Sequence, residues 1–234
     1  MNPKVGIKEA YEKEAESYDK TRAWFQYGRF AHRERKLLFD LLRRKGRVLF
    51  IACGTGRHIR FVVNQLGCEV IGLDLSRAMI EIARRKLSET EKERVHFIVA
   101  DAEHLPFREN AFDGVVCSRA FYLFIDKFKA LREAYYVLKK NGRLLLSSVF
   151  MDLLLTRLGI RVGVFSADPA DFPYTSEQCA SMLKKAGFQK VHRRCITFLT
   201  GDPWFLPPPV LRIISLMEDI SRGGRWVMVI GEKT

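Results

Sequence analysis

From Arg47 onward, short apolar runs alternate along the chain with segments whose apolar residues recur at helical spacing. Short apolar runs bounded by turn residues predict buried strands, and their alternation with helices predicts a parallel sheet joined by helical crossovers. The strands are expected at Val48–Ala52, Glu69–Leu73, Val95–Val99, Asp113–Ser118, Arg143–Phe150, Phe188–Thr197 and Trp226–Gly231. The predicted fold class is therefore α/β, a doubly wound, Rossmann-like sheet with helices on both faces.

The helices between these strands are expected to start near Arg57, Ser76, Lys127 and Ser176. Ser76 and Ser176 are candidate N-caps, because a serine hydroxyl accepts a hydrogen bond from a free N–H of the first turn. Residues 1–46 precede the first strand and contain apolar residues at helical spacing, namely Phe30, Leu37, Leu38, Leu41 and Leu42. This N-terminal segment is predicted to be helical and to pack one face on the sheet domain.

Two insertions break the alternation, at residues 151–175 and 201–225. Both follow strands of the later half of the sheet, and open α/β sheets bind ligands beyond the carboxyl ends of their strands, so we expect substrate walls or a lid. The second insertion contains Pro207-Pro208-Pro209, followed by apolar residues at roughly helical spacing. Such an amphipathic helix packs in the core, lines an apolar pocket or contacts a membrane surface. No Pro/Gly/Ser-rich linker divides the chain, so residues 1–234 are interpreted as one domain.

Composition narrows the class of protein. Hydrophobic residues form 47% of the 234, but no apolar run approaches the roughly 18 residues of a membrane span, and the first residues lack the apolar core of a signal peptide. We therefore expect a soluble, cytoplasmic protein. The five cysteines contain no Cys-x-x-Cys pair, which argues against a disulfide framework and a structural metal. Charged residues form 29% of the chain while Asn and Gln number four each, a balance typical of thermophile proteins.

The basic residues are concentrated in two clusters. The formal net charge is +13, and eight basic residues against Glu34 and Asp40 lie between Arg29 and Arg47. The second cluster comprises Lys184, Lys185, Lys190, Arg193 and Arg194. Neither cluster shows the basic and aromatic interleaving of nucleic-acid modules. Solvated surface, peripheral contact with an anionic membrane and contact with RNA all stay open.

A buried strand that ends in a glycine turn precedes the first helix of the sheet, in the run Val48-Leu49-Phe50-Ile51-Ala52-Cys53-Gly54-Thr55-Gly56. Glycine is needed where the backbone turns sharply and a ligand approaches without a Cβ in the way. The third glycine of the dinucleotide pattern G-x-G-x-x-G is absent, because Ile59 occupies that position. The turn thus predicts a nucleotide site, but it gives less indication of a bound pyrophosphate than a complete dinucleotide pattern would.

Two acidic residues stand at the ends of the second and third predicted strands. Asp74 follows the strand Glu69–Leu73, and a carboxylate at this tip can accept both hydroxyls of a ribose. The third strand ends in Asp101-Ala102-Glu103, where a carboxylate can receive an adenine amino group, and Phe112-Asp113 opens the fourth. A glycine turn followed by one carboxylate placed to bind a ribose and another placed to bind an adenine predicts a site for an adenosine without phosphates.

These motifs resemble the class I S-adenosylmethionine-dependent methyltransferases, most closely the branch that contains ubiquinone and menaquinone C-methyltransferases. The resemblance covers about Tyr11 to Phe150 and includes Tyr18-Asp19, similar to a Tyr-Asp pair near the cofactor. It rests on Ile51-Ala52-Cys53-Gly54-Thr55-Gly56, on Gly72-Leu73-Asp74-Leu75-Ser76 with Met79, on Asp101-Ala102-Glu103-His104-Leu105-Pro106-Phe107 and on Phe112-Asp113. It implies a seven-stranded, mostly parallel sheet with the last strand antiparallel, and S-adenosylmethionine as cofactor.

The resemblance also implies which residues contact the cofactor. Cys53, Gly54 and Gly56 would lie against the methionine part and the ribose, and Asp74 would bind the ribose hydroxyls. Leu75 and Met79 would pack near the adenine, while Asp101 and Ala102 would meet its edge. The expected cofactor-binding residues are Tyr18, Ala52, Cys53, Gly54, Gly56, Asp74, Leu75, Met79, Asp101, Ala102 and Ser118.

Two residues of the turn depart from the family pattern. The family usually has an acidic residue at the position of Phe50 and a glycine at that of Ala52. The first change removes a polar anchor behind the turn, and the second narrows the space beside the methionine chain. Because of these two departures, a second interpretation stays open, in which the protein is a methyltransferase-like scaffold that binds cofactor or a partner without turnover.

The expected reaction needs little covalent help from the protein. Methyl transfer from a sulfonium is an in-line displacement, so alignment and exclusion of water supply much of the acceleration. The catalytic residues are left unassigned, with His32, His58, His104 and His192 as nominal candidates for a base. A small, partly apolar acceptor such as a quinone precursor or lipid-like molecule is the hypothesis, and no metal is expected.

Two further enzyme classes are alternatives to this hypothesis. A tRNA or other RNA methyltransferase stays open because of the basic clusters, although Val116-Cys117-Ser118-Arg119-Ala120 lacks the Asn/Asp-Pro-Pro-Tyr pattern. Cys117 is interpreted as a small buried residue rather than a nucleophile, because the proline of cytosine C5 enzymes does not precede it. Tyr135-x-x-x-Lys139 matches a dehydrogenase pair, but its place in the helix after the fourth strand indicates coincidence.

Overall fold

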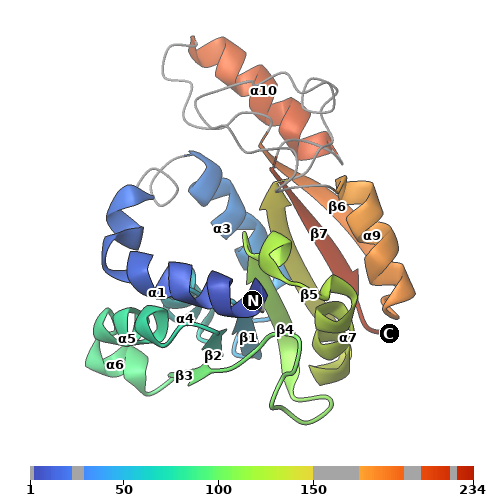
Figure 1. The fold of residues 1–234 in the computed structure, drawn as a ribbon. Coiled ribbons are helices and arrows are strands. Elements are labelled where there is room, and N and C mark those ends of the chain that lie inside the picture. The colour runs from blue at the N-terminus through green and yellow to red at the C-terminus, as the bar shows by residue number, and fades with distance from the viewer. Residues whose placement is uncertain (1–2, 23–28, 150–173, 198–206, 222–225) are drawn as a thin grey trace.

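The computed structural model describes residues 3–22, 29–149, 174–197, 207–221 and 226–234. Within these ranges seven strands form one sheet, in the order β3-β2-β1-β4-β5-β7-β6 (Figure 1). The strands are β1 (Arg47–Ile51), β2 (Glu69–Asp74), β3 (Val95–Val99), β4 (Phe112–Ser118), β5 (Leu138–Val149), β6 (Lys190–Thr197) and β7 (Trp226–Glu232). β1 pairs in parallel with β2 and β4, and the parallel pairing continues outward to β3 and β5. β7 is antiparallel to both β5 and β6, so the predicted fold class is confirmed.

Alternating residues of each strand divide the core between the two faces of the sheet. In β1, Val48 and Phe50 belong to the cluster that includes side chains of α3 and α4. Leu49 and Ile51 belong to the cluster that includes side chains of α7 and α9. This follows from the period of two in a pleated strand, and it requires helices on both faces. The helices are α1 (Pro3–Thr21), α3 (Arg29–Leu41), α4 (Ile59–Leu66), α5 (Arg77–Arg85), α6 (Glu89–Lys92), α7 (Lys127–Val137), α9 (Ser176–Lys185) and α10 (Pro208–Ile220), with a 3₁₀ turn η1 at Phe121–Leu123.

The structure confirms one predicted N-cap and corrects the other. Ser76 precedes α5, and its Oγ accepts a hydrogen bond of 3.2 Å from the N–H of Met79. Ser176 is instead the first residue of α9, and the cap is Thr175. The Thr175 hydroxyl accepts from the N–H of Gln178, whose side chain accepts from the N–H of Thr175. Gln178 at the third helical position completes this capping box, which moves the cap one residue earlier than predicted.

β5 begins five residues earlier than expected from the apolar run. Leu138 pairs with Phe112, and the register shifts between Phe112 and Gly114 before regular pairing resumes at Arg143. The polar stretch between Leu138 and Arg143 therefore belongs to the strand because of backbone pairing, which the hydrophobic pattern does not report. Phe150, the expected end of the strand, lies outside the described residues.

The N-terminal segment contributes two helices with different positions. α3 packs against α4, β5 and β6 on one face of the sheet. α1 packs on α5 and crosses the edge of the sheet where the parallel strands end (Figure 1). The carboxylate of Glu12 accepts the N–H groups of Arg77 at 2.8 Å and of Ala78 at 3.1 Å. Glu12 thereby satisfies free donors of the first turn of α5 and fixes α1 above the carboxyl ends of the strands.

The two predicted insertions are described only in part. Residues 151–173 of the first, and residues 201–206 and 222–225 of the second, lie outside the described residues. The helix predicted to start at the three prolines is present as α10, which begins at Pro208 with Pro207 as its N-cap. Its apolar side chains are exposed rather than in the core, with Ile213 58%, Leu216 66% and Ile220 84% exposed, whereas Glu218 is buried against Thr197. In the described ranges no helix combines the length and apolarity needed to cross a membrane.

Candidate functional site

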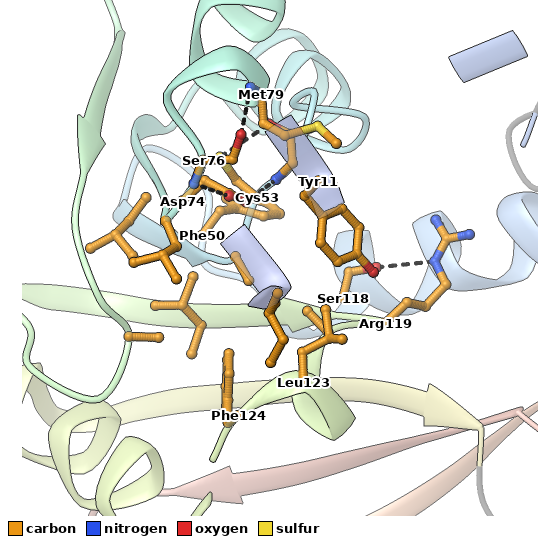
Figure 2. A pocket seen from close by; sticks show the side chains of 18 of the residues that line it. Tyr11, Phe50, Cys53, Asp74, Ser76, Met79, Ser118, Arg119, Leu123 and Phe124 are labelled. Carbon is orange, nitrogen blue, oxygen red and sulfur yellow. Dashed lines mark hydrogen bonds between the residues drawn. The ribbon is translucent and has the colours of Figure 1, made fainter. Parts of the chain in front are cut away.

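A cavity of about 370 Å³ lies at the carboxyl ends of the parallel strands, beneath α1 (Figure 2). Its lining extends across the sheet, from Asp101 after β3, through Asp74 of β2 and the turn after β1, to Ser118 of β4 and Trp226 of β7. The expected cofactor-binding residues other than Gly56 all line it. The order of the strands thus brings motifs that are far apart in the sequence into one chamber.

The turn after β1 has three residues in the left-handed region, at Ala52 (φ 50°), Gly54 (φ 55°) and Gly56 (φ 75°). A Cβ on Gly54 would have no atom within 4 Å, so the backbone here borders open space. A Cβ on Gly56 would lie 3.2 Å from that of Ala83 in α5. Gly56 therefore permits close packing of the turn against α5, and it does not line the cavity.

Ala52 occupies a left-handed conformation that usually requires glycine. Replacing Ala52 by glycine should raise the free energy of unfolding by about 0.5–1 kcal/mol, because relief of the strained φ exceeds the extra entropy of glycine in the unfolded chain. Urea denaturation measures the change. Ala120→Gly is the matched control, because Ala120 is buried at a φ of −126° and its replacement should lower stability. Equal losses in the two variants would contradict the role given to φ at Ala52.

Asp74 connects the end of β2 to the glycine turn. One carboxylate oxygen accepts the N–H of Gly54 at 2.7 Å, and the other accepts the N–H of Ser76 at 2.9 Å. Burial raises the pKa of Asp74, and the bonds from these two N–H groups partly offset the effect. Each oxygen keeps a further lone pair for a ligand. The sequence indicates Asp74 as an acceptor for ribose, but not that it also holds the turn through Gly54.

The other predicted acid, Asp101, is engaged by a residue that the sequence does not single out. The Nζ of Lys4 on α1 lies 2.6 Å from Asp101 and 2.6 Å from Glu103. Burial alone would raise the pKa of Asp101, but the hydrogen bond from Lys4 helps to bring it below the usual range. No motif contains Lys4, because its position depends on how α1 crosses the sheet. Leu75, Met79 and Ala102 line this same end of the cavity.

The C-terminal end of α1 and the glycine turn are joined by polar contacts. Asp19 accepts the hydroxyl of Thr55 at 2.7 Å and pairs with Lys86. Tyr18 lines the cavity, and the guanidinium of Arg22 lies 4.3 Å from the centre of its ring. The two residues of the Tyr-Asp pair therefore have different contacts: Tyr18 lines the cavity, and Asp19 binds the glycine turn through Thr55.

A fully buried carboxylate, Glu34 of α3, lies behind the end of β4. Its Oε1 accepts the hydroxyls of Ser118 at 2.7 Å and of Ser147. Its Oε2 lies 3.0 Å from Nε2 of His58 and 3.5 Å from Nη2 of Arg119. Ser118 was predicted to face the cofactor, yet its hydroxyl is directed to Glu34. In the sequence Glu34 is only one of two acids in a basic stretch, and no spacing connects it with these partners.

The histidine candidates separate clearly by position. His32, His104 and His192 are exposed and do not line the cavity. His58 is buried and lines it, and burial lowers its pKa despite the neighbouring Glu34. The buried Cys117 does not line the cavity, and burial raises the pKa of its thiol to about 12, so it is not available as a thiolate nucleophile.

Comparison with known proteins agrees with these features. Residues 49–146 match the family model described as a methyltransferase domain. The chain is 30% identical over 204 residues to demethylmenaquinone methyltransferase of Thermotoga maritima, covering 76% of this chain and 86% of the relative. It is 29% identical over 208 residues to the enzyme of that name in Lactiplantibacillus plantarum, covering 79% and 88%. Among solved structures, an S-adenosylmethionine-dependent methyltransferase of Thermotoga maritima aligns with a TM-score of 0.70 and 25% identity, covering 96% of this chain and 98% of that one.

These likenesses extend beyond the motifs to most of the chain. The dehydrogenase, RNA methyltransferase and non-catalytic alternatives gain no support from the relatives, which are methyltransferases by name. Tyr135, half of the dehydrogenase pair, packs edge-on against Phe188 and does not line the cavity. The resemblance seen in the sequence is confirmed. The chain belongs to the class I S-adenosylmethionine-dependent methyltransferases, in the branch that contains the ubiquinone and menaquinone C-methyltransferases, and its cofactor is S-adenosylmethionine.

Proposed function

We propose that the protein transfers the methyl group of S-adenosylmethionine to a small, partly apolar acceptor, such as a quinone precursor or another lipid-like molecule. The observation that carries the proposal is the single cavity that joins the acid-bearing ends of β2 and β3 to an aromatic end near β4 and β7. A donor and an acceptor placed in one chamber can meet in line, which is the main requirement of a methyl displacement.

The donor half lies toward β2 and β3. Asp74 would accept the ribose hydroxyls with its remaining lone pairs, while Leu75 and Met79 pack against the adenine. The open space beside Gly54 fits this use, since a bulky ligand can approach the backbone there. Asp101 can receive an adenine amino group only beside Lys4, which already contacts one of its oxygens. These residues fit an adenosine, and the bound cofactor would supply a methyl group activated on a positively charged sulfur.

The acceptor half lies on the far side of the glycine turn. Phe50, Ile59 and Trp226 contribute apolar surface to the cavity there and belong to one buried cluster. Aromatic and aliphatic walls favour a flat or branched apolar ligand over a heavily hydrated one. The named substrates of the Thermotoga and Lactiplantibacillus relatives are demethylated menaquinones, which have this character. Five residues of α1 line the cavity, so this helix would exclude water while the two reactants are aligned.

Transfer of labelled methyl from S-adenosylmethionine into a fractionated cell extract tests the proposal. We expect the label in the organic-soluble fraction, because the acceptor end of the cavity is apolar. The purified protein without extract is the control for self-labelling. Label in RNA alone would overturn the proposed acceptor class, while methyl transfer itself would stand.

A further inference from the structure

A lysine in the first turn of α1 contacts two acids that follow β3. The Nζ of Lys4 donates to Oδ2 of Asp101 at 2.6 Å and lies 2.6 Å from Oε2 of Glu103. The Glu103 side chain is only 5% exposed, so a charge there needs a partner. All three residues line the cavity. One ammonium group therefore binds two carboxylates at the proposed adenosine end of the cavity.

The other contacts of the two acids leave Asp101 able to accept a further hydrogen bond. Oδ1 of Asp101 accepts the N–H of Glu103 at 2.9 Å, and Oε1 of Glu103 accepts the N–H of Ile125 at 2.8 Å. His104 lies 3.3 Å from Oδ2 of Asp101, but its side chain is 63% exposed, so water and salt screen its effect. A carboxylate oxygen has two lone pairs, so Oδ1 keeps one for a ligand.

The rest of α1 is held on the domain by contacts that do not involve this lysine. Ala15 belongs to the buried cluster between α1 and α5, and Glu12 accepts two N–H groups at the start of α5. The first turn is more open, because Val5 is 44% exposed and a Cβ on Gly6 would have no atom within 4 Å. A change at Lys4 should therefore alter the position of the first turn and leave α1 packed on α5.

Without the ammonium group, the two carboxylates would repel each other. The oxygens that contact Nζ each lie 2.6 Å from it, so they are close enough for like charge to favour protonation of one of them. Protonation turns a carboxylate from an acceptor into a donor. Lys4 thus keeps Asp101 an acceptor of hydrogen bonds. The amino group of a purine is the matching donor, whereas a carbonyl oxygen at the same ring position is not.

We propose that Lys4 is a positioning residue that makes the cofactor site selective for a 6-amino purine over a 6-oxo purine. Through its contacts with Asp101 and Glu103, Lys4 holds Asp101 as a fixed, ionised acceptor for the adenine amino group. The same contacts hold the first turn of α1 beside the base. The inference rests on the proposed function, which places the adenosine at Asp101, but it is independent of which acceptor is methylated.

The test compares S-adenosylhomocysteine with S-inosylhomocysteine, which carries a carbonyl oxygen in place of the 6-amino group. Isothermal titration calorimetry gives both dissociation constants for each folded protein. The wild type should prefer the adenine ligand by roughly 10- to 100-fold, the range of one hydrogen bond to a charged group. Lys4→Met should weaken S-adenosylhomocysteine about tenfold and change S-inosylhomocysteine by less than about threefold, so most of the preference is lost. Lys4→Arg, which can still bind two carboxylates, should restore most of it.

Lys13→Met is the matched control, because Lys13 is an exposed lysine of the same helix and does not line the cavity. Equal weakening of both ligands by Lys4→Met would mean that Lys4 only supports the fold, and the proposal would be wrong. Tighter binding of S-adenosylhomocysteine by that variant would show that Lys4 competes with adenine for Asp101, which also overturns it, as would a wild type without preference. Failure of the proposed function would appear separately, as methyl label in RNA alone.

Discussion

Replacing Asp74 by alanine should weaken binding of S-adenosylhomocysteine by more than about tenfold, because the two ribose hydroxyls lose their charged acceptor. The same substitution frees the N–H groups of Gly54 and Ser76, which Asp74 accepts in the folded protein. The glycine turn, which Asp74 holds through Gly54, would then be less ordered, and this would add to the loss of affinity. Isothermal titration calorimetry on the folded variant measures the affinity directly.

The control for this substitution is Glu69→Ala. Glu69 lies at the opposite end of the same strand and is exposed, and its ion pair in the described part of the chain is with the exposed Arg47. This substitution removes the same charge at a position outside the cavity, so the affinity for S-adenosylhomocysteine should stay within about twofold of the wild-type value. An Asp74→Ala protein that is folded and binds with unchanged affinity would show that the adenosine lies elsewhere.

Replacing Glu34 by alanine should lower the free energy of unfolding by about 3–5 kcal/mol, the range measured when one partner of a buried ion pair is removed. Glu34 is fully buried, and its replacement removes the carboxylate that lies 3.5 Å from Arg119 and that accepts two serine hydroxyls. Urea denaturation followed by circular dichroism measures the change. Glu69→Ala should cost less than about 1 kcal/mol, because its pair is exposed. Equal costs for the two variants would contradict the buried network.

The contribution of Glu34 should also depend on pH. Burial alone would raise its pKa, but Arg119 and His58 hold the pKa well below the usual range of a glutamate. A group whose pKa is lowered on folding stabilises the protein above its unfolded pKa, and the stabilisation is lost as the pH falls through the folded value. The stability difference between wild type and Glu34→Gln should hold at neutral pH and shrink below about pH 4. A difference that grows on acidification would contradict this sign.

The parts of the fold that the sequence predicts are those that depend on neighbouring residues. Alternating apolar runs located the strands, and acids at strand ends located Asp74 and Asp101, since parallel strands bring their carboxyl ends to one edge. Gly56 shows the limit of such reasoning. The motif suggests a ligand contact, whereas the structure shows that the missing side chain makes room for Ala83.

The buried network around Glu34 was not predictable in the same way. Glu34, His58, Arg119 and Ser147 come from four separate parts of the chain, and Ser147 lies 113 residues from Glu34. No spacing connects them, because α3 reaches β4 and β5 only through tertiary packing. The sequence does not indicate Lys4 for the same reason, because its contacts with Asp101 and Glu103 depend on how α1 packs. The N-cap of α9 also depends on a second residue. Thr175 rather than Ser176 is the cap, because Gln178 lies at the third helical position from Thr175 and completes a capping box with it.

A crystal structure of the protein with S-adenosylhomocysteine and a naphthol would show whether one cavity holds both the methyl donor and the acceptor. We expect the ribose hydroxyls on Asp74, the sulfur beside the glycine turn, and the naphthol in the same cavity against Phe50 and Trp226. Ribose away from Asp74, or a naphthol bound outside this cavity, would contradict this expectation.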